Sequence, residues 1–281
     1  MCCIKNRVLL LLLCMTFCAV SGCGQKNEAG GSRESHGVSE SAVRESVKLS
    51  ETDQTFSDPE KEAETENSEK EEAEQMESAT LLYQGHASIR ILTSEGEVIY
   101  LDPFMGEGYD LAADLILMTH DHYDHTREEM IKNRNEDCRV IKWSDAIIEG
   151  KHQTFDLGFV TVEAVEAGYN KNHDASKCVG FILTFPDGTK AYFSGDTSTT
   201  PSMAQLSGEN LDYAFICCDG VFNMDVEEAS ECAKLIGAKH TIPYHMEPVK
   251  DDSGFDEAAA ESFDAPGKII LRPGEELELV H

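Results

Sequence analysis

One run of seven residues, 119–125, constrains the fold of this 281-residue chain more than any other part of the sequence. It reads Thr-His-Asp-His-Tyr-Asp-His and directly follows the uncharged apolar stretch 115–118. A short continuous apolar stretch is typical of a buried strand. We therefore expect a sheet whose edge presents the three histidines and Asp124 together.

The residue types in this run favour a metal centre. Imidazole nitrogen and carboxylate oxygen are ligands that suit Zn²⁺, Fe²⁺ or Mn²⁺. His120 and His122 lie two residues apart and would point to the same side of an extended chain. Asp124 and His125 follow the expected turn and can serve a second ion. The alternative, a group of ordinary hydrogen-bonded histidines, explains the four fixed positions less well.

The first 22 residues have the pattern of a lipoprotein signal peptide. Lys5 and Arg7 precede an apolar stretch, residues 8–20, and small residues follow it, as in a secretory signal. Val-Ser-Gly-Cys at 20–23 resembles the lipobox of bacterial lipoproteins, which implies cleavage before Cys23 and a lipid on its sulfur. The protein would then be extracytoplasmic and anchored to the cell membrane. An uncleaved anchor is the alternative, but the stretch is short for a spanning helix.

The next segment has the composition of a tether. Residues 24–78 contain 16 acidic and 6 basic residues and almost no aromatic ones. Such a segment cannot bury enough apolar surface to offset its ordering entropy, so residues 23–78 are interpreted as the lipid-attachment cysteine and a disordered acidic tether.

Residues 79–281 are long enough for one domain. Their 37 acidic and 15 basic residues give a net charge of −22, which argues against nucleic acid as a partner.

The domain is predicted to contain many short strands, with helices alternating between the later ones. The predicted strands are residues 80–83, 87–92, 98–101, 115–119, 139–142, 154–157, 159–165, 179–185, 190–194, 212–217, 239–242, 268–271 and 277–280. The predicted helices are residues 127–133, 201–206, 225–236 and 255–263. This order indicates an α/β fold in which two sheets lie between helical layers.

The cysteines of the domain do not predict a disulfide framework. They are odd in number and include no Cys-x-x-Cys pair, so a zinc ribbon is not indicated either. Most are interpreted as buried small apolar side chains. A redox or metal role for the adjacent Cys217 and Cys218 stays open.

Three further polar residues, His173, Asp196 and His245, lie at or near the ends of other predicted strands. Ligands from loops at one edge of a scaffold are what a two-metal site needs. At this point the chain resembles the metallo-β-lactamase-fold metal-dependent hydrolases, and most of all the branch of ascorbate-6-phosphate lactonase. The motifs that carry the likeness are Gly-His-Ala-Ser at 85–88, Leu-Asp-Pro at 101–103, residues 119–125, Tyr-Asn at 169–170 with His173, Gly-Asp-Thr at 195–197 and Pro-Tyr-His at 243–245.

The resemblance implies a four-layer αββα sandwich that holds two divalent metal ions, zinc first and manganese or iron as alternatives. It assigns to the first ion His120, His122 and His173, to the second Asp124, His125 and His245, and to both ions Asp196. His86 and Asp102 would lie next to these ligands, and Asp102 would orient a ligand imidazole.

The expected function is hydrolysis of a small-molecule ester, lactone, amide or phosphoester by a metal-bridging hydroxide. Asp124 or Asp196 would accept a proton from the attacking water. Candidate substrate contacts are Tyr123, Tyr169, Asn170 and Tyr244. Two other functions stay open at this stage. One is a metal- or solute-binding lipoprotein that does no chemistry, and the other is a nuclease of the same fold, which the acidity of the domain disfavours.

Overall fold

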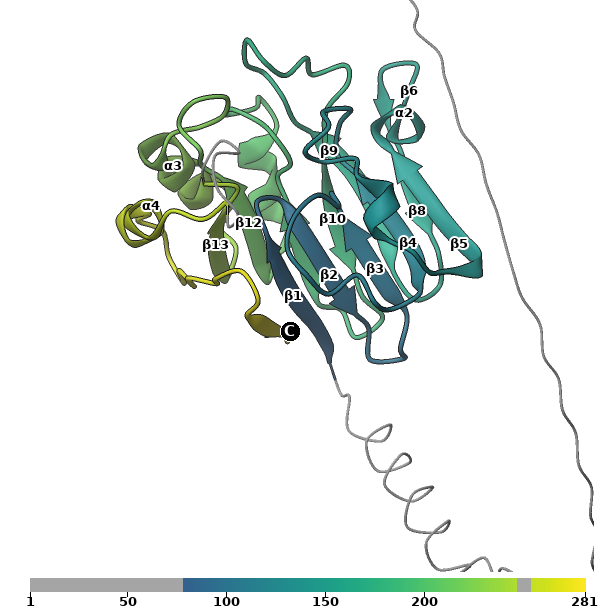
Figure 1. Cartoon of the computed structure of the whole chain (residues 1–281). Coiled ribbons are helices and arrows are strands. Elements are labelled where there is room, and N and C mark those ends of the chain that lie inside the picture. Colours follow the sequence, from purple (N-terminus) through teal and green to yellow (C-terminus); the bar gives the residue numbers. More distant parts are fainter. Residues whose placement is uncertain (1–77, 247–253) are drawn as a thin grey trace, which may run out of the picture. The chain divides into compact units, whose positions relative to one another are not determined.

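Two six-stranded β-sheets lie face to face, with strands β2 and β3 in front of β10 in Figure 1. The computed structural model describes residues 78–246 and 254–281, all within one compact unit. The predicted signal peptide, Cys23 and the tether up to residue 77 lie outside the described residues. Among those that are described, no helix has the length and apolar character needed to cross a membrane.

The first sheet is built mainly from the N-terminal part of the domain. Its strands, in spatial order, are β14 (Glu276–Leu279), β1 (Ala79–Gly85), β2 (Ser88–Leu92), β3 (Val98–Leu101), β4 (Ala113–Met118) and β5 (Arg134–Lys142). The strands β3, β4 and β5 are parallel to one another, whereas β1 is antiparallel to both of its neighbours.

The second sheet contains the rest of the long strands. Its spatial order is β13 (His240–Tyr244), β12 (Tyr213–Cys217), β11 (Lys190–Phe193), β10 (Val179–Thr184), β9 (Thr161–Glu166) and β8 (Thr154–Asp156). Here β11, β12 and β13 are parallel. A small hairpin of β6 (Ile147–Ile148) and β7 (Lys151–His152) follows the one-turn helix α2 (Trp143–Ala146).

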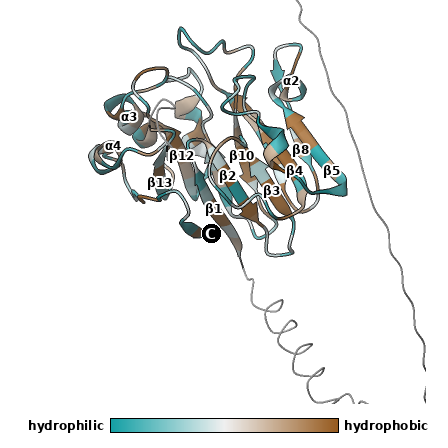
Figure 2. Cartoon of the chain, viewed as in Figure 1, coloured by the Kyte–Doolittle hydropathy of each residue, from teal (hydrophilic) through white to brown (hydrophobic). Residues whose placement is uncertain are grey.

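Alternation of side chains on the strands builds the core between the sheets. Ile99 and Leu117 belong to the main core, whereas their neighbours Tyr100 and Met118 belong to a smaller apolar cluster with Ile131. Because both faces of β3 and of residues 115–118 in β4 are buried, these stretches are continuously apolar in sequence, as is usual for parallel strands. Figure 2 shows apolar residues concentrated on these strands.

Helices and loops cover the outer faces, so the predicted α/β sandwich is confirmed. α3 (Val226–Ile236) contacts β12 and the 3₁₀ helix η2 (Met203–Glu209), and α4 (Glu257–Ser262) follows later in the chain. Asp225 caps the start of α3 by accepting a hydrogen bond from the N–H of Glu228, and Gly237 ends it with a φ of 68°, the expected pattern of caps.

Two predicted elements are largely absent, and the strand predicted at 139–142 is longer, because β5 begins at Arg134. The helix expected at 127–133 is only the 3₁₀ turn η1 (Glu128–Met130), because β5 begins at Arg134 and pairs there with Ala113 of β4. The strand expected at 268–271 is reduced to one isolated bridge between Lys268 and Thr241. At the first of these places the pairing of β5 with β4 overrides the local preference for a helix.

The topology gathers the ends of several strands at one edge. The strands β3, β4 and β13 lead directly into Asp102, the run 119–125 and His245 at their carboxyl ends. After one further residue, β11 leads into Gly195-Asp196 and β12 into Asp219. Parallel strands end on the same side of a sheet. Backbone hydrogen bonds join the two sheets at this edge, from the N–H of Val179 to the carbonyl of Thr119 and from the N–H of His245 to the carbonyl of His86.

Candidate metal centre

The first group of imidazoles at this edge consists of His120, His122 and His173. Each of these residues offers a ring nitrogen within 4.8 Å of the nitrogens of the other two. The ring centroids of His120 and His173 are 5.1 Å apart, although 52 residues separate them in the chain. His120 and His173 are buried, and His122 is exposed. The structure therefore brings together the three residues predicted for the first ion.

A second group lies beside the first and contains Asp124, His125 and His245. His86 joins them, because its Nε2 lies 3.3 Å from Oδ2 of Asp124. The ring centroids of His125 and His245 are 5.3 Å apart. His86 was expected only to lie next to the ligands, but the structure places its ring nitrogen among the donor atoms. Asp124 is the partly exposed member, with 20% of its side chain accessible.

The carboxylate of Asp196 lies between the two groups. Its Oδ2 is 3.2 Å from Nε2 of His173 and 4.0 Å from Nε2 of His120. Its Oδ1 is 3.3 Å from Nε2 of His125 and 3.2 Å from Nε2 of His245. Each oxygen thus faces one group, which is the arrangement that a shared ligand of two cations requires.

Several polar atoms of this cluster are buried without a hydrogen-bond partner. They are Nε2 of His120, His125 and His245 and Oδ1 of Asp196. Buried polar atoms without partners are rare in folded proteins and need an explanation. A bound cation supplies one, since imidazole nitrogens and a carboxylate oxygen are suitable donors for Zn²⁺ or a similar ion. The residues present therefore fit a metal centre.

Neighbouring groups orient three of these imidazoles through their Nδ1 atoms. Nδ1 of His125 lies 2.9 Å from Oδ2 of Asp102, and Nδ1 of His173 lies 3.1 Å from Oδ1 of Asn170. Nδ1 of His120 lies 3.1 Å from Oγ1 of the adjacent threonine. Such bonds select the tautomer in which Nε2 carries the free lone pair. In each case Nε2 is the nitrogen that faces the centre of the cluster.

Three residues of the site have backbone conformations that are rare for side chains other than glycine. The φ angles are 53° for His86, 45° for Asp102 and 46° for His245. Histidine and aspartate enter this region more often than most residues, yet the conformation is strained and typically occurs at functional sites. All three residues directly follow a strand or its final turn, so the chain bends sharply and turns each side chain inward.

Burial controls the ionisation of the imidazoles. It lowers the pKa of His120 to about 3 and the pKa of both His86 and His125 to about 4. These rings are therefore neutral near pH 7. His245 differs, because burial lowers its pKa but the carboxylate of Asp196 raises it further, to a net value of about 9. Burial favours a protonated Asp196, but His245 and His125 hold the pKa of its carboxyl well below the usual range.

Two polar residues at the site were not predicted from the sequence. Asn223 donates from Nδ2 to Oδ2 of Asp196 at 2.8 Å and to Oδ2 of Asp219 at 2.7 Å. Asp219 follows the end of β12, as Asp102 follows β3 and Asp196 follows β11. That position at a strand end was the available signal for Asp219. Asn223 lies in a loop whose sequence contains no such signal.

The remaining candidates have different surroundings. Tyr123 and Tyr169 are exposed, by 67% and 44%, and lie beside site residues in the chain. Tyr244 is wrong as a substrate contact, because it is fully buried and its hydroxyl accepts a hydrogen bond from the N–H of Gly195.

Cys217 and Cys218 are buried free thiols whose sulfurs contact backbone carbonyls. Burial raises the pKa of both thiols, as expected for small apolar core residues.

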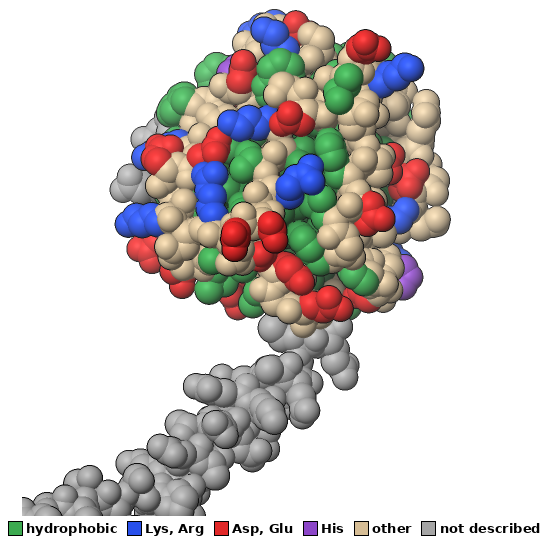
Figure 3. Space-filling model, turned by 90° about the vertical axis from the view of Figure 1, so that its right-hand side faces the viewer, with side chains coloured by type: hydrophobic (Ala, Val, Ile, Leu, Met, Phe, Trp, Pro, Cys, Tyr) green, Lys and Arg blue, Asp and Glu red, His purple; other side chains and the backbone are tan. Residues whose placement is uncertain are grey.

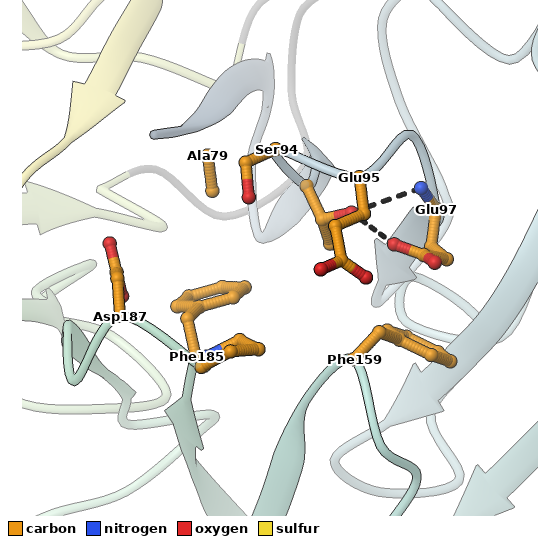
Figure 4. A pocket seen from close by; sticks show the side chains of 9 residues that line it. Ala79, Ser94, Glu95, Glu97, Phe159, Phe185 and Asp187 are labelled. Carbon is orange, nitrogen blue, oxygen red and sulfur yellow. Dashed lines mark hydrogen bonds between the residues drawn. The ribbon is translucent and has the colours of Figure 1, made fainter. Parts of the chain in front are cut away.

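A separate cavity at the opposite end of the strands does not belong to this centre. Figure 4 shows side chains that line it, among them Ser94, Glu97 and Phe185, where β3 begins and β10 ends. Its volume of about 10 Å³ accommodates about one water molecule, so it is too small for a substrate.

Comparison with known proteins points to one family. Residues 80–245 match the family model described as beta-lactamase superfamily domain. A UPF0173 metal-dependent hydrolase of Methanoregula boonei is 30% identical over 221 residues, which cover 71% of this chain and 97% of that protein. A metallo hydrolase from Ignicoccus hospitalis has a similar structure, with a TM-score of 0.58, 19% identity, and coverage of 73% of this chain and 99% of that one. The metallo-beta-lactamase fold protein YhfI from Bacillus subtilis has a TM-score of 0.52 and 14% identity, with coverage of 71% and 99%.

Proposed function

The chain belongs to the UPF0173 metal-dependent hydrolases of the metallo-β-lactamase superfamily, and from this premise we propose that it is a dinuclear zinc hydrolase of a small molecule. The substrate class is an ester, lactone, amide or phosphoester. A nearer kinship with the ascorbate-6-phosphate lactonases stays a prediction from the motifs. Since the chain is a hydrolase, the alternative of a binding protein that does no chemistry is set aside.

The position of Asp196 carries the proposal of two ions. Its two carboxylate oxygens face two separate groups of imidazoles, and several of the facing atoms are buried without partners. One ion could be held by His120, His122 and His173, the other by Asp124, His125 and His245, with Asp196 shared. The predominance of imidazole favours zinc, and manganese or iron are the alternatives.

Bound divalent cations would lower the pKa of water and polarise the carbonyl or phosphoryl oxygen of the substrate. The chain's own residues have three roles. Asp102 and Asn170 hold two imidazoles in the required orientation. The exposed His122 and partly exposed Asp124 mark the side from which a substrate can enter. Burial raises the pKa of Asp124, but its hydrogen bond to His86 lowers it further, so this carboxylate is ionised, as a metal ligand or a proton acceptor must be.

A nuclease of the same fold is the less favoured function. The full chain has a net charge of −30, whereas proteins that bind nucleic acid need a basic footprint. On the face shown in Figure 3, acidic side chains are interspersed with lysine and arginine around exposed apolar groups. Small substrates do not need an extended basic surface, so the charge fits them better.

The same proposal places the enzyme outside the cytoplasm on a lipid anchor at Cys23. This location is supported by the sequence pattern of residues 1–23, which lie outside the described residues. We expect the Cys23→Ala protein to leave the membrane fraction, whereas the wild type sediments with it. Fractionation of cells that express each form tests this, and a wild type found in the cytosol would contradict it.

Metal analysis and turnover test the dinuclear centre. We expect two zinc equivalents per wild-type chain and hydrolysis of a chromogenic ester or phosphodiester that a chelator abolishes. Because each variant removes one ligand, His122→Ala and Asp196→Ala should each lower metal content and reduce kcat/KM by about 100-fold or more. His281→Ala, outside the site, is the matched control and should change neither quantity. Full metal content in both ligand variants would refute the ligand assignment.

A further inference from the structure

Asn223 links two carboxylates at the site through one amide group. Its Nδ2 donates to Asp196 at 2.8 Å and to Asp219 at 2.7 Å. An amide has two N–H donors, so both are used by these bonds. The side chain is half-buried. Both N–H donors of Asn223 therefore bind carboxylates of the protein, and neither is left to bind a substrate.

Asp219 holds Asn223 in place. It follows the end of β12, its side chain is buried, and its Oδ1 accepts hydrogen bonds from three backbone N–H groups. The donors are Val221 at 2.7 Å, Phe222 at 2.6 Å and Asn223 at 3.3 Å. These bonds fix the loop after β12, while the other oxygen of Asp219 accepts the bond from Asn223. The amide is thus anchored both through its backbone and through its side chain.

The hydrogen bond from Nδ2 of Asn223 reaches only one of the two carboxylate oxygens of Asp196, Oδ2. Four imidazole nitrogens lie within 4.0 Å of this carboxylate, two near each oxygen. Asn223 donates only to Oδ2, so rotation of the carboxylate about its Cβ–Cγ bond would break that hydrogen bond. We propose that Asn223, held by Asp219, is a positioning residue that fixes the Asp196 carboxylate with one oxygen toward each histidine group. This inference rests on the proposed function, in which Asp196 is shared by two ions.

The same network reaches the first histidine group. Oδ1 of Asn223 lies 3.5 Å from Nδ2 of Asn170, whose own Oδ1 accepts hydrogen bonds from the backbone and Nδ1 of His173. A chain of hydrogen bonds through Asn223 and Asn170 therefore connects Asp196 with His173. An aspartate at 223 would place a third carboxylate at hydrogen-bond distance from two others, so the amide is the group that this position requires.

Asn223→Asp tests the proposal, since it keeps the shape of the side chain and replaces a donor with a negative charge. The measurement is the zinc dissociation constants of the full-length protein by competition with a chromogenic chelator. We expect at least one constant to rise by about 10- to 100-fold, the usual effect of losing a residue that orients a ligand. Asn223→Ala, which adds no charge, should give a smaller rise of about 10-fold.

A matched control is available at Asn135, which is exposed on β5 and donates from Nδ2 to Asp114 at 2.6 Å. Asn135→Asp makes the same chemical change beside a carboxylate outside the site, and zinc affinity should stay at the wild-type value. If Asn223→Asp also keeps wild-type affinity for two zinc ions, the positioning role is overturned and the proposed function stands. A wild type that holds fewer than two ions defeats the proposed function itself.

The fold of each variant is followed separately by far-ultraviolet circular dichroism and by melting of the metal-free protein. A positioning role predicts that Asn223→Ala keeps the spectrum and the melting temperature of the metal-free wild type while its zinc affinity falls. If Asn223→Ala and Asn223→Asp both fail to fold, the proposal is overturned, because Asn223 would then support the loop rather than the carboxylate.

Discussion

Asp102 shows how a single residue can serve both the backbone and the chemistry of the site. Its φ of 45° ends β3 with a sharp bend, and its carboxylate accepts hydrogen bonds from the N–H and Oγ1 of Thr119 at 2.8 and 2.7 Å. The same carboxylate is 2.9 Å from Nδ1 of His125. Burial raises the pKa of Asp102 to about 7, and a cation bound at His125 would favour its ionised form.

Asp102→Asn separates these two roles. Asparagine also tolerates a positive φ, so the bend should persist. Its single amide oxygen would accept the hydrogen bond from the N–H of Thr119, which leaves an N–H group facing Nδ1 of His125 that cannot accept a hydrogen bond. We expect zinc affinity to fall by about 10- to 100-fold, measured by chelator competition. Asp114→Asn is the control, because Asp114 accepts bonds from Val98 and Asn135 outside the site. Equal zinc affinities of the Asp102 variant and the wild type would show that this carboxylate does not orient the ligand.

At the scale of elements, the turn after β11 depends on Gly195. Its φ is 58°, and a Cβ added there would lie 2.8 Å from the carbonyl oxygen of Val179 and 3.0 Å from Cβ of Thr119. The turn thus passes close to β10 of its own sheet and to the end of β4 in the other sheet. This close approach brings Asp196 next to the residues that follow β4.

Gly195→Ala should therefore lower the free energy of unfolding by more than a strained, positive φ alone would lower it. We expect a loss of about 2–4 kcal/mol, from the strained φ together with overpacking, measured by urea denaturation. Gly188→Ala is the matched control, since Gly188 has a φ of 94° but nothing within 4 Å of the added Cβ. Its loss should be about 1–2 kcal/mol. If the two losses are equal, the close contact with Val179 and Thr119 is not important for stability.

The elements also show what local sequence can and cannot predict. Apolar runs such as those of β4 and β12 are buried on both faces, so their sequence alone predicted them. The run 119–125 was predictable because its polar residues are adjacent. Asn223 was not, because its function depends on two carboxylates 4 and 27 residues away. For the same reason η1 is short, since β5 begins at Arg134 and pairs there with Ala113 of β4.

At the scale of the whole molecule, the candidate ligands come from both sheets. His120, His122 and His125 follow β4 of the first sheet, whereas Asp196 and His245 follow β11 and β13 of the second. Ions held by both sets would connect the sheets at this edge. Ligand binding that is confined to the folded state stabilises it by mass action. The metal centre should therefore contribute to the stability of the entire domain.

Removal of the metal tests this contribution. At a free zinc concentration about 100 times the dissociation constant, each bound ion stabilises the folded state by about 2.7 kcal/mol. For a domain of this size one such ion corresponds to a fall in melting temperature of about 5–10 °C after chelation, and two ions to about twice that. Differential scanning calorimetry of the zinc-loaded and chelated protein at pH 7 measures it. Identical melting temperatures would mean that no ion connects the sheets.

The metal-free protein should also become less stable as the pH falls from 6.5 toward 4. His86, His120 and His125 have folded-state pKa values of about 3–4, so in this window the unfolded chain binds more protons at these rings. Asp102, with a raised pKa of about 7, works in the opposite direction. His245 does so as well, because its folded-state pKa is about 9 and only the unfolded chain takes up its proton as the pH falls through about 6.5. These two groups oppose three. The melting temperature of the chelated protein should therefore be lower at pH 5 than at pH 7, and an equal or higher value at pH 5 would mean that these imidazoles are not buried in the neutral form.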